Sequence, residues 1–144
     1  MRDGPEASLY PVLLEQYPAS RFHCLFEVPY GRKRVDLVVV PKRQTDSWVV
    51  AIEFKVKDWR SALWQARLNS SIVHRSFVAL RVDGVPAISK RALFERAGVG
   101  LIAIEVDEST AEVVIPAPNV SKRFTDEQIH SIWARHIELE VVGG

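Results

Sequence analysis

The chain has 144 residues, of which 47% are hydrophobic, and its net charge is +1 at pH 7. This size and composition predict one compact domain over residues 1–144 with a substantial apolar core. No run reaches the roughly 20 apolar residues of a membrane span, and the first five residues lack the apolar core of a signal peptide. A charge so near zero gives no general reason to expect a nucleic-acid partner. The single cysteine, Cys24, excludes an internal disulfide, and its apolar neighbours indicate a buried thiol in a reducing, cytoplasmic compartment.

The first predicted element is an amphipathic helix over residues 6–17. Leu9 and Leu13 lie on one stripe of such a helix. Pro11 would remove a hydrogen bond from a helix interior, so the helix either begins shortly before it or kinks. Glu6 precedes Leu9 by three residues and Leu13 by seven, which directs it along the inward face. The alternative is an acid that simply favours a helix N-terminus.

Three strands are predicted next, over residues 21–29, 34–40 and 48–56, with polar turns between them. The turn between the first two strands is strongly basic because Arg32, Lys33 and Arg34 follow one another there. This trio suits a contact with a phosphate backbone. A solvated hairpin end accounts for it equally well.

Ionisable residues interrupt two of these apolar strands. Asp36 lies within the second strand, and Glu53 and Lys55 lie two residues apart in the third, on one face. The polar turn between the two strands predicts an antiparallel hairpin in which Pro41 pairs with Trp48, so that Asp36 lies opposite Glu53. Facing side chains are about 5 Å apart, and two carboxylates at that distance repel unless a divalent cation binds between them. Such hard oxygen ligands suit Mg²⁺ or Mn²⁺.

A helix over residues 59–70 follows, with Asp58 as its N-cap. Ser61, Gln65 and Asn69 repeat at intervals of four along it, and this polar line could face the carboxylates or simply the solvent. Between positions 30 and 67 the chain has nine basic residues and four acids. This local excess suits a polyanion, although a solvated surface is again an alternative. The candidates for phosphate contact in and beside this helix are Lys57, Arg60 and Arg67.

The rest of the chain alternates between strand and helix. Strands are predicted over residues 76–82, 99–106 and 111–115, and helices over residues 90–97 and 125–138. We expect Ser89 to cap the first of these helices and Gly98 to end it, and Thr125 and Gln128 to form a capping box for the second. His74 has no second ligand at metal-binding spacing, which favours a structural role. The pattern predicts an α/β fold with a mixed central sheet flanked by helices, plus a C-terminal β-hairpin and helix.

One motif in this pattern resembles a known family. Asp36, sixteen intervening residues and then Glu53-Phe54-Lys55 resemble the signature of the PD-(D/E)XK nuclease superfamily, which has the restriction-endonuclease-like fold. Val35 stands where the signature has proline, which is a common departure. The strand-turn-strand context gives the short Glu-x-Lys pattern its specificity.

The predicted helix extends the resemblance. Gln65 resembles the helix glutamine of many branches of the superfamily, where it would bind a substrate phosphate or a metal-bound water. Asn69 stands where some branches have a tyrosine, so the chain departs from those branches. The resemblance implies an α-β-β-β-α-β core over about residues 5–116.

The resemblance also implies roles for the polar residues. Asp36, Glu53 and the Phe54 carbonyl would hold one or two Mg²⁺ or Mn²⁺ ions. Lys55 would position or deprotonate the attacking water, or pair with the scissile phosphate. Glu6 would add or orient a metal ligand from the first helix.

The sequence therefore predicts a metal-dependent nuclease acting on nucleic acid, with DNA as the preferred substrate and endonucleolytic cleavage. Two alternatives stay open: a catalytically silent binding module on the same fold, and a buried ion network within an interaction domain. A homodimer, formed through the last helix, or a larger complex could supply specificity.

Overall fold

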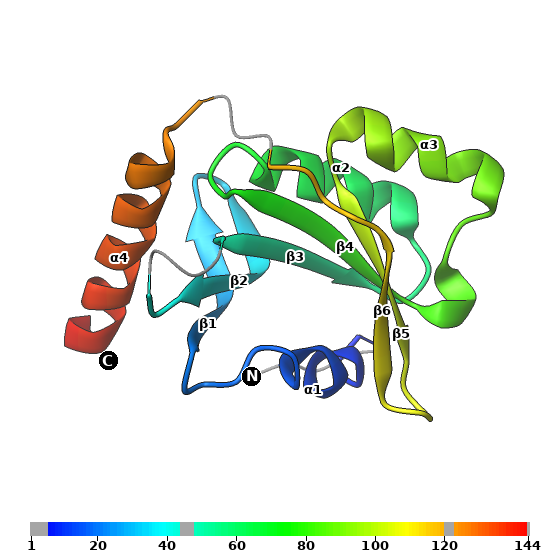
Figure 1. Ribbon diagram of the computed structural model, residues 1–144, viewed down its shortest axis with the longest axis horizontal. Coiled ribbons are helices and arrows are strands. Elements are labelled where there is room, and N and C mark those ends of the chain that lie inside the picture. The colour runs from blue at the N-terminus through cyan, green and yellow to red at the C-terminus, as the bar shows by residue number, and fades with distance from the viewer. Residues whose placement is uncertain (1–5, 44–47, 120–122, 144) are drawn as a thin grey trace.

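The computed structural model describes residues 6–43, 48–119 and 123–143, with side chains of the last helix described up to residue 139. All six strands form one sheet in the order β1-β2-β3-β4-β5-β6 (Figure 1). A short 3-10 turn, Val82–Gly84, follows the fourth strand. The helices and strands along the chain are α1 (Leu9–Leu14), β1 (Phe22–Tyr30), β2 (Lys33–Pro41), β3 (Val50–Lys55), α2 (Trp59–Asn69), β4 (Arg75–Arg81), α3 (Ile88–Ala97), β5 (Gly100–Glu105), β6 (Thr110–Ile115) and α4 (Asp126–Gly143).

The sheet is mixed because helices connect only its central strands. β1–β2, β2–β3 and β5–β6 pair antiparallel, whereas β3–β4 and β4–β5 pair parallel. Parallel neighbours need a long crossover, and α2 and α3 supply the two crossovers. The predicted mixed sheet, flanked by helices and followed by a C-terminal hairpin and helix, is confirmed.

Helices cover both faces of the sheet (Figure 1). α1 packs on one face, where Leu9 and Leu13 join a cluster with Leu37 and Ile52. α2 and α3 cover the other face over β4 and β5, and α4 covers that same face over β1 to β3, mainly through Trp133. Because β2 and β3 are covered on both sides, they are near-continuous apolar runs.

In the β1–β2 hairpin, the alternation of side chains between the two faces of the sheet is interrupted at Glu27 and Asp36. The ladder pairs the residues before and after Glu27 with the residues after and before Asp36, so Glu27 and Asp36 lie opposite each other between these pairs. Glu27 has φ of 49°, an uncommon value for a residue other than glycine. Val35 packs in the same cluster as Val38, although strict alternation puts residues three apart on opposite faces. As a result, Lys33 turns toward the face that α2 covers.

Most of the expected helix ends are confirmed. The Asp58 carboxylate accepts a hydrogen bond from the Ser61 N–H at 3.2 Å, and Gly98 ends α3 with φ of 70°. Thr125 and Gln128 form the expected capping box, with reciprocal bonds of 2.9 and 3.2 Å. Side-chain and backbone signals within single turns were therefore sufficient to place these ends.

Three local expectations were wrong. α3 begins at Ile88, so Ser89 lies inside the first turn instead of capping it, and the N-cap is Ala87. α1 is shorter than the predicted range 6–17, but it begins shortly before Pro11, which is one of the two expected alternatives. Pro11 lies in its first turn, where the missing N–H has no intrahelical acceptor in any case. Cys24 is half-buried, with its Sγ 3.9 Å from the Tyr17 carbonyl oxygen, so the thiol is only partly enclosed.

No helix within the described residues is both long enough and apolar enough to cross a membrane.

Candidate active site

The β2–β3 ladder ends one step before the two predicted carboxylates. Its last pair is Leu37 with Ile52, in the register expected from the turn. At the next step, side chains take the place of backbone pairing. The Phe54 N–H donates to Asp36 Oδ2 at 2.9 Å, and the Asp36 N–H makes a long contact of 3.4 Å to Glu53 Oε1. Each carboxylate therefore receives an N–H group from the opposite strand, and the two acids lie side by side.

The surroundings of Glu53 are unfavourable for its ionised carboxylate. It is 5% exposed. Burial, and then the neighbouring Asp36 carboxylate, raise the pKa of Glu53 to about 8, while a hydrogen bond from Asn69 acts in the opposite direction. Two carboxyl groups in such contact tend to hold one proton between them near neutral pH.

Asn69 connects this buried acid to a lysine. Its Nδ2 donates to Glu53 Oε1 at 2.8 Å, and its Oδ1 accepts from Lys33 Nζ at 2.7 Å. Gln65, one helical turn earlier, presents its backbone and side-chain oxygens to Lys33 Nζ, both at 3.4 Å. Burial lowers the pKa of Lys33, and the nearby Glu53 charge opposes that shift. β2, β3 and α2 thus meet in one polar network inside the fold.

Sequence reasoning placed Lys33 among the surface contacts for phosphate and missed its inward position. The sequence did not show this position because strict alternation from Asp36 puts Lys33 on the opposite face of β2. The interruption of alternation at Glu27 places Lys33 on the face that α2 covers. Asn69 belongs to the polar line for which two alternatives were open, facing the carboxylates or facing the solvent, and Asn69 itself faces Glu53. The residue closest to the acid is thus Asn69, one turn beyond the predicted Gln65.

Lys55 and Phe54 occupy opposite faces of β3. Lys55 is half-buried at the strand end, and alternation places it on the face of Glu53. Its ammonium group forms no hydrogen bond or ion pair with another described residue. Phe54 stacks on Tyr10 of α1, with ring centroids 3.9 Å apart. The N–H and C=O groups of one strand residue project toward the same neighbouring strand, so the Phe54 carbonyl is directed to the side where Asp36 lies.

Glu6 is not brought to this pair. It lies in the turn before α1, where its carbonyl oxygen accepts the Leu9 N–H at 3.0 Å. α1 packs on the Phe54 face of the sheet, opposite to the face that carries Glu53. Across residues 6–43, 48–119 and 123–143, no three His, Cys, Asp or Glu side chains form a possible metal-binding group. The expected third acid is therefore absent from the described site.

The other predicted phosphate contacts lie at the surface. Arg32 and Arg34 are exposed at the hairpin end, Lys57 is exposed after β3, and Arg60 and Arg67 are exposed on α2. They surround the network without joining it, and their contact with nucleic acid stays a prediction.

The donor chemistry of the acid pair fits a divalent cation. Asp36 and Glu53 together offer hard carboxylate oxygens, and Mg²⁺ commonly binds proteins through one or two carboxylates and retains waters. A cation also favours the ionised form of Glu53, which burial and then the Asp36 carboxylate disfavour. The pair is thus suited to an ion even without a third acidic side chain.

Comparisons with known proteins support the fold. No protein-family model matches the chain, and no curated protein matches it either. The chain is similar to the crystal structure of a repair endonuclease from Pyrococcus abyssi, with a TM-score of 0.50 and 20% identity. The likeness covers 73% of this chain and 49% of that chain, so this chain spans about half the length of that protein. It shows that the mixed sheet and its helices form a nuclease-like α/β fold.

Proposed function

We propose that this chain is a metal-dependent nuclease of the PD-(D/E)XK type, with its active site at Asp36 and Glu53. The observation that supports the proposal is that these two acids lie side by side at the end of the β2–β3 ladder, each held by a backbone N–H group of the opposite strand. Burial, and then the neighbouring Asp36 carboxylate, raise the pKa of Glu53 to about 8, so the ionised form of this acid is disfavoured without a cation. Acids held in this way gain most from a bound cation.

Asp36, Glu53 and the Phe54 carbonyl would hold Mg²⁺ or Mn²⁺. Such an ion supplies Lewis-acid chemistry: it lowers the pKa of a bound water and offsets charge on the phosphate in the transition state. The chain's own contribution is to keep both carboxylates fixed by backbone N–H groups.

Lys55 and the Lys33–Asn69 bridge have different roles in this proposal. Lys55 shares the face of Glu53 and can stabilise negative charge on the scissile phosphate by electrostatic attraction. Asn69 and Lys33 act on Glu53 itself, because the 2.8 Å bond from Asn69 fixes the carboxylate orientation. Lys55 would therefore be a catalytic residue, whereas Asn69 and Lys33 would be positioning residues.

DNA is the substrate that we propose. The structurally similar protein is described as a repair endonuclease, and the sequence around the acid pair has a local excess of basic residues. Exposed arginines such as Arg32 and Arg34 at the hairpin end would contribute to binding through the phosphate backbone, which depends on salt and not on sequence.

The test is metal-dependent nicking of supercoiled plasmid DNA. We expect the purified chain to nick it with Mg²⁺ or Mn²⁺, and chelator to abolish the reaction. Asp36→Asn and Lys55→Ala should each lower the rate by about a hundredfold or more. The matched control is Asp107→Asn, which removes an exposed acid outside the site and should keep the full rate. Equal rates in Asp36→Asn and the control would exclude this active site.

A catalytically silent module is the second candidate, and one observation favours it. Glu53 already has hydrogen-bond donors within the protein, and Asn69 and Lys33 complete a polar network without a metal. In that case DNA would bind with and without chelator, and the chain would not cleave it. Retention that is equal in wild type and in Asp36→Asn, together with no nicking, would identify the module.

A further inference from the structure

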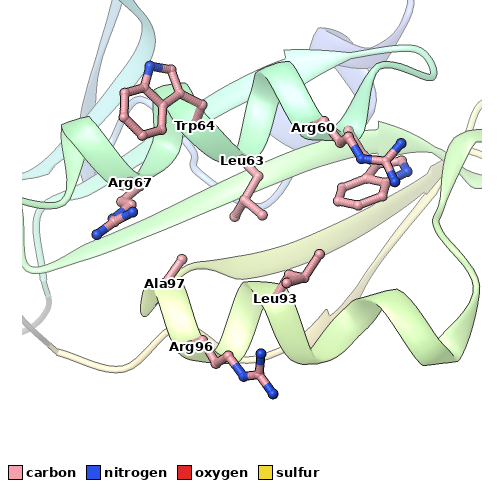
Figure 2. A pocket seen from close by; sticks show the side chains of 8 residues that line it. Arg60, Leu63, Trp64, Arg67, Leu93, Arg96 and Ala97 are labelled. Atoms are coloured by element: carbon pink, nitrogen blue, oxygen red, sulfur yellow. The ribbon is translucent and has the colours of Figure 1, made fainter.

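A groove of about 460 Å³ lies between α2 and α3, on the outer side of the helix that carries Asn69. Figure 2 shows Leu63 of α2 directed toward Leu93 and Ala97 of α3, which form an apolar floor. The volume lies in the range of ordinary ligand pockets, and such pockets combine an apolar lining with a few polar groups. Nothing in the proposed reaction uses this groove.

Tryptophan and arginine surround the floor. Trp64 is 57% exposed, an unusual state for a large aromatic ring on a soluble protein. Arg60, Arg67 and Arg96 also line the groove, and no described lining residue is acidic. None of these three guanidinium groups forms an ion pair with another described residue. One ring is already in a cation–π contact, because the Arg60 Cζ lies 4.5 Å from the centre of the Trp59 ring.

The charge of the two helices specifies the occupant further. α2 and α3 together contain five basic residues and one acid, which gives +4, whereas the whole chain carries only +1. These two helices are therefore markedly more basic than the chain as a whole. An occupant with matching chemistry must be strongly anionic and must also offer flat apolar surfaces to the tryptophan rings.

Unpaired nucleic acid has both properties. Its phosphates match the unpaired arginines, and its bases have exposed faces that stack on aromatic side chains and on arginine. A duplex buries those faces in its own stack, so it would use the charges but not the rings. α2 also joins the groove to the acid pair, because Gln65 and Asn69 on its inner side contact Lys33 and Glu53.

We propose that the α2–α3 groove is a binding site for a single-stranded stretch of nucleic acid, with a base stacked on the exposed Trp64 ring and phosphates on Arg60, Arg67 and Arg96. The inference deepens the proposed function, and it rests on that function for the class of polyanion. It assigns the groove a role in substrate choice: an unpaired segment occupies it while the strand reaches Asp36 and Glu53.

The test is fluorescence anisotropy with a labelled oligothymidine of about 15 nucleotides, in chelator so that no cleavage occurs. We expect Trp64→Ala and Arg96→Ala each to weaken binding by about fivefold or more. Lys90→Ala is the matched control for charge, since Lys90 is exposed on the same helix but does not line the groove. Val113→Ala, on β6 and 51% exposed, is the control for loss of an exposed apolar side chain. Both controls should change affinity by less than about twofold.

Several outcomes would overturn the proposal. Equal losses in Arg96→Ala and Lys90→Ala would show diffuse attraction without a site. Duplex DNA of the same length that binds as tightly as the single strand would exclude stacking. An acidic, tryptophan-containing peptide that binds in the groove and is not displaced by oligothymidine would make it a protein-docking site.

The groove and the active site can fail separately. If oligothymidine binding depends on Trp64 but the chain shows no metal-dependent nicking, the groove proposal is supported and the nuclease proposal is rejected. If nicking depends on Asp36 but Trp64→Ala leaves it unchanged on both single-stranded and duplex substrates, the nuclease proposal is supported and the groove proposal is rejected.

Discussion

At Glu53 the surroundings oppose the ionised state from two directions. The side chain is 5% exposed, and the Asp36 carboxylate is its neighbour. Because the folded-state pKa is about 8, above the value of the unfolded chain, the protonated form contributes stability at low pH. This contribution is lost as the pH rises through about 8. An acid kept under these conditions is more readily explained by binding or catalysis than by stability.

Glu53→Gln should therefore stabilise the chain in the absence of metal. The amide keeps an oxygen that can accept the Asn69 bond and removes the charge, so at pH 9 we expect a gain in unfolding free energy of about 1 kcal/mol or more. At pH 5, where the wild-type acid is protonated, the two proteins should differ little. Thermal melts in chelator at both pH values measure this. A variant that is less stable than wild type at pH 9 would contradict the interpretation that the ionised form of Glu53 destabilises the fold.

Asn69 is the second residue whose loss has a defined consequence. It is fully buried and satisfies both Lys33 and Glu53. Asn69→Leu removes one partner from the half-buried Lys33 ammonium and from the buried Glu53 carboxyl group, and we expect it to cost about 1–3 kcal/mol of unfolding free energy. Gln65→Leu, on the same helix with contacts of only 3.4 Å, is the matched control and should cost less. Urea denaturation compares the two, and equal losses would show that the bridge has no special weight.

At the scale of single elements, the β2–β3 hairpin was predictable in its register because a polar turn of fixed length determines which residues face each other. The contact between Asp36 and Glu53 followed directly. The position of Lys33 was not predictable, since it depends on a change of facing at Glu27, where φ is 49°. A residue type does not reveal such a backbone state unless it is glycine. The start of α3 was missed for a related reason: Ser89 is a good cap residue, but the helix begins at Ile88, two residues before the predicted start, without any side-chain cap.

A buried hydrogen bond joins α4 to the segment between α2 and β4. Trp133 Nε1 donates to the Ile72 carbonyl oxygen at 2.8 Å, and the indole ring is fully buried. Trp133→Phe removes the donor and leaves the carbonyl oxygen without it, so we expect a loss of about 1–3 kcal/mol. Trp64→Phe, at a ring that is 57% exposed, makes the same chemical change and should stay within about 0.5 kcal/mol. If both variants lose the same unfolding free energy in chemical denaturation, the Trp133 hydrogen bond makes no particular contribution to the stability of the fold.

His74, just before β4, should make this packing sensitive to pH. It is fully buried, its Nδ1 accepts the Val49 N–H at 3.0 Å, and its Nε2 lies 3.5 Å from Asp126 Oδ1. Burial, then the charge of His130, lower the pKa of His74; Asp126 opposes the shift and Arg75 adds to it. The folded chain therefore favours the neutral ring, so the stability that it contributes is present above the ordinary histidine pKa of about 6.5 and is lost as the pH falls below that value.

The variant that checks this is His74→Gln. It should be less stable than wild type at pH 7.5, since the amide replaces a well-packed ring, yet it should lose less stability between pH 7.5 and pH 5. Denaturant midpoints at the two pH values give the slopes for both proteins. Parallel slopes would show that His74 does not titrate within the unfolding equilibrium.

At the scale of the whole molecule, the two faces of β3 differ, because one is apolar and the other carries the polar network. α1 packs on the face of β3 that carries Phe54, whereas the polar network lies on the opposite face, against α2. α2 then has acid-site contacts on one side and an arginine- and tryptophan-lined groove on the other.

Metal binding should be visible in the stability of the whole fold. An ion that binds the folded chain and not the unfolded chain adds about 2.7 kcal/mol when its concentration is 100 times its Kd. We therefore expect Mn²⁺ to raise the melting temperature of wild type, and to do so more at pH 8.5 than at pH 6, because the ion must displace the proton held by Glu53. Asp36→Asn and Glu53→Gln should each remove most of this shift, whereas Asp107→Asn should keep it. A shift of equal size in all four proteins would mean that Mn²⁺ binds elsewhere, and the acid pair would then be a purely structural junction between β2 and β3.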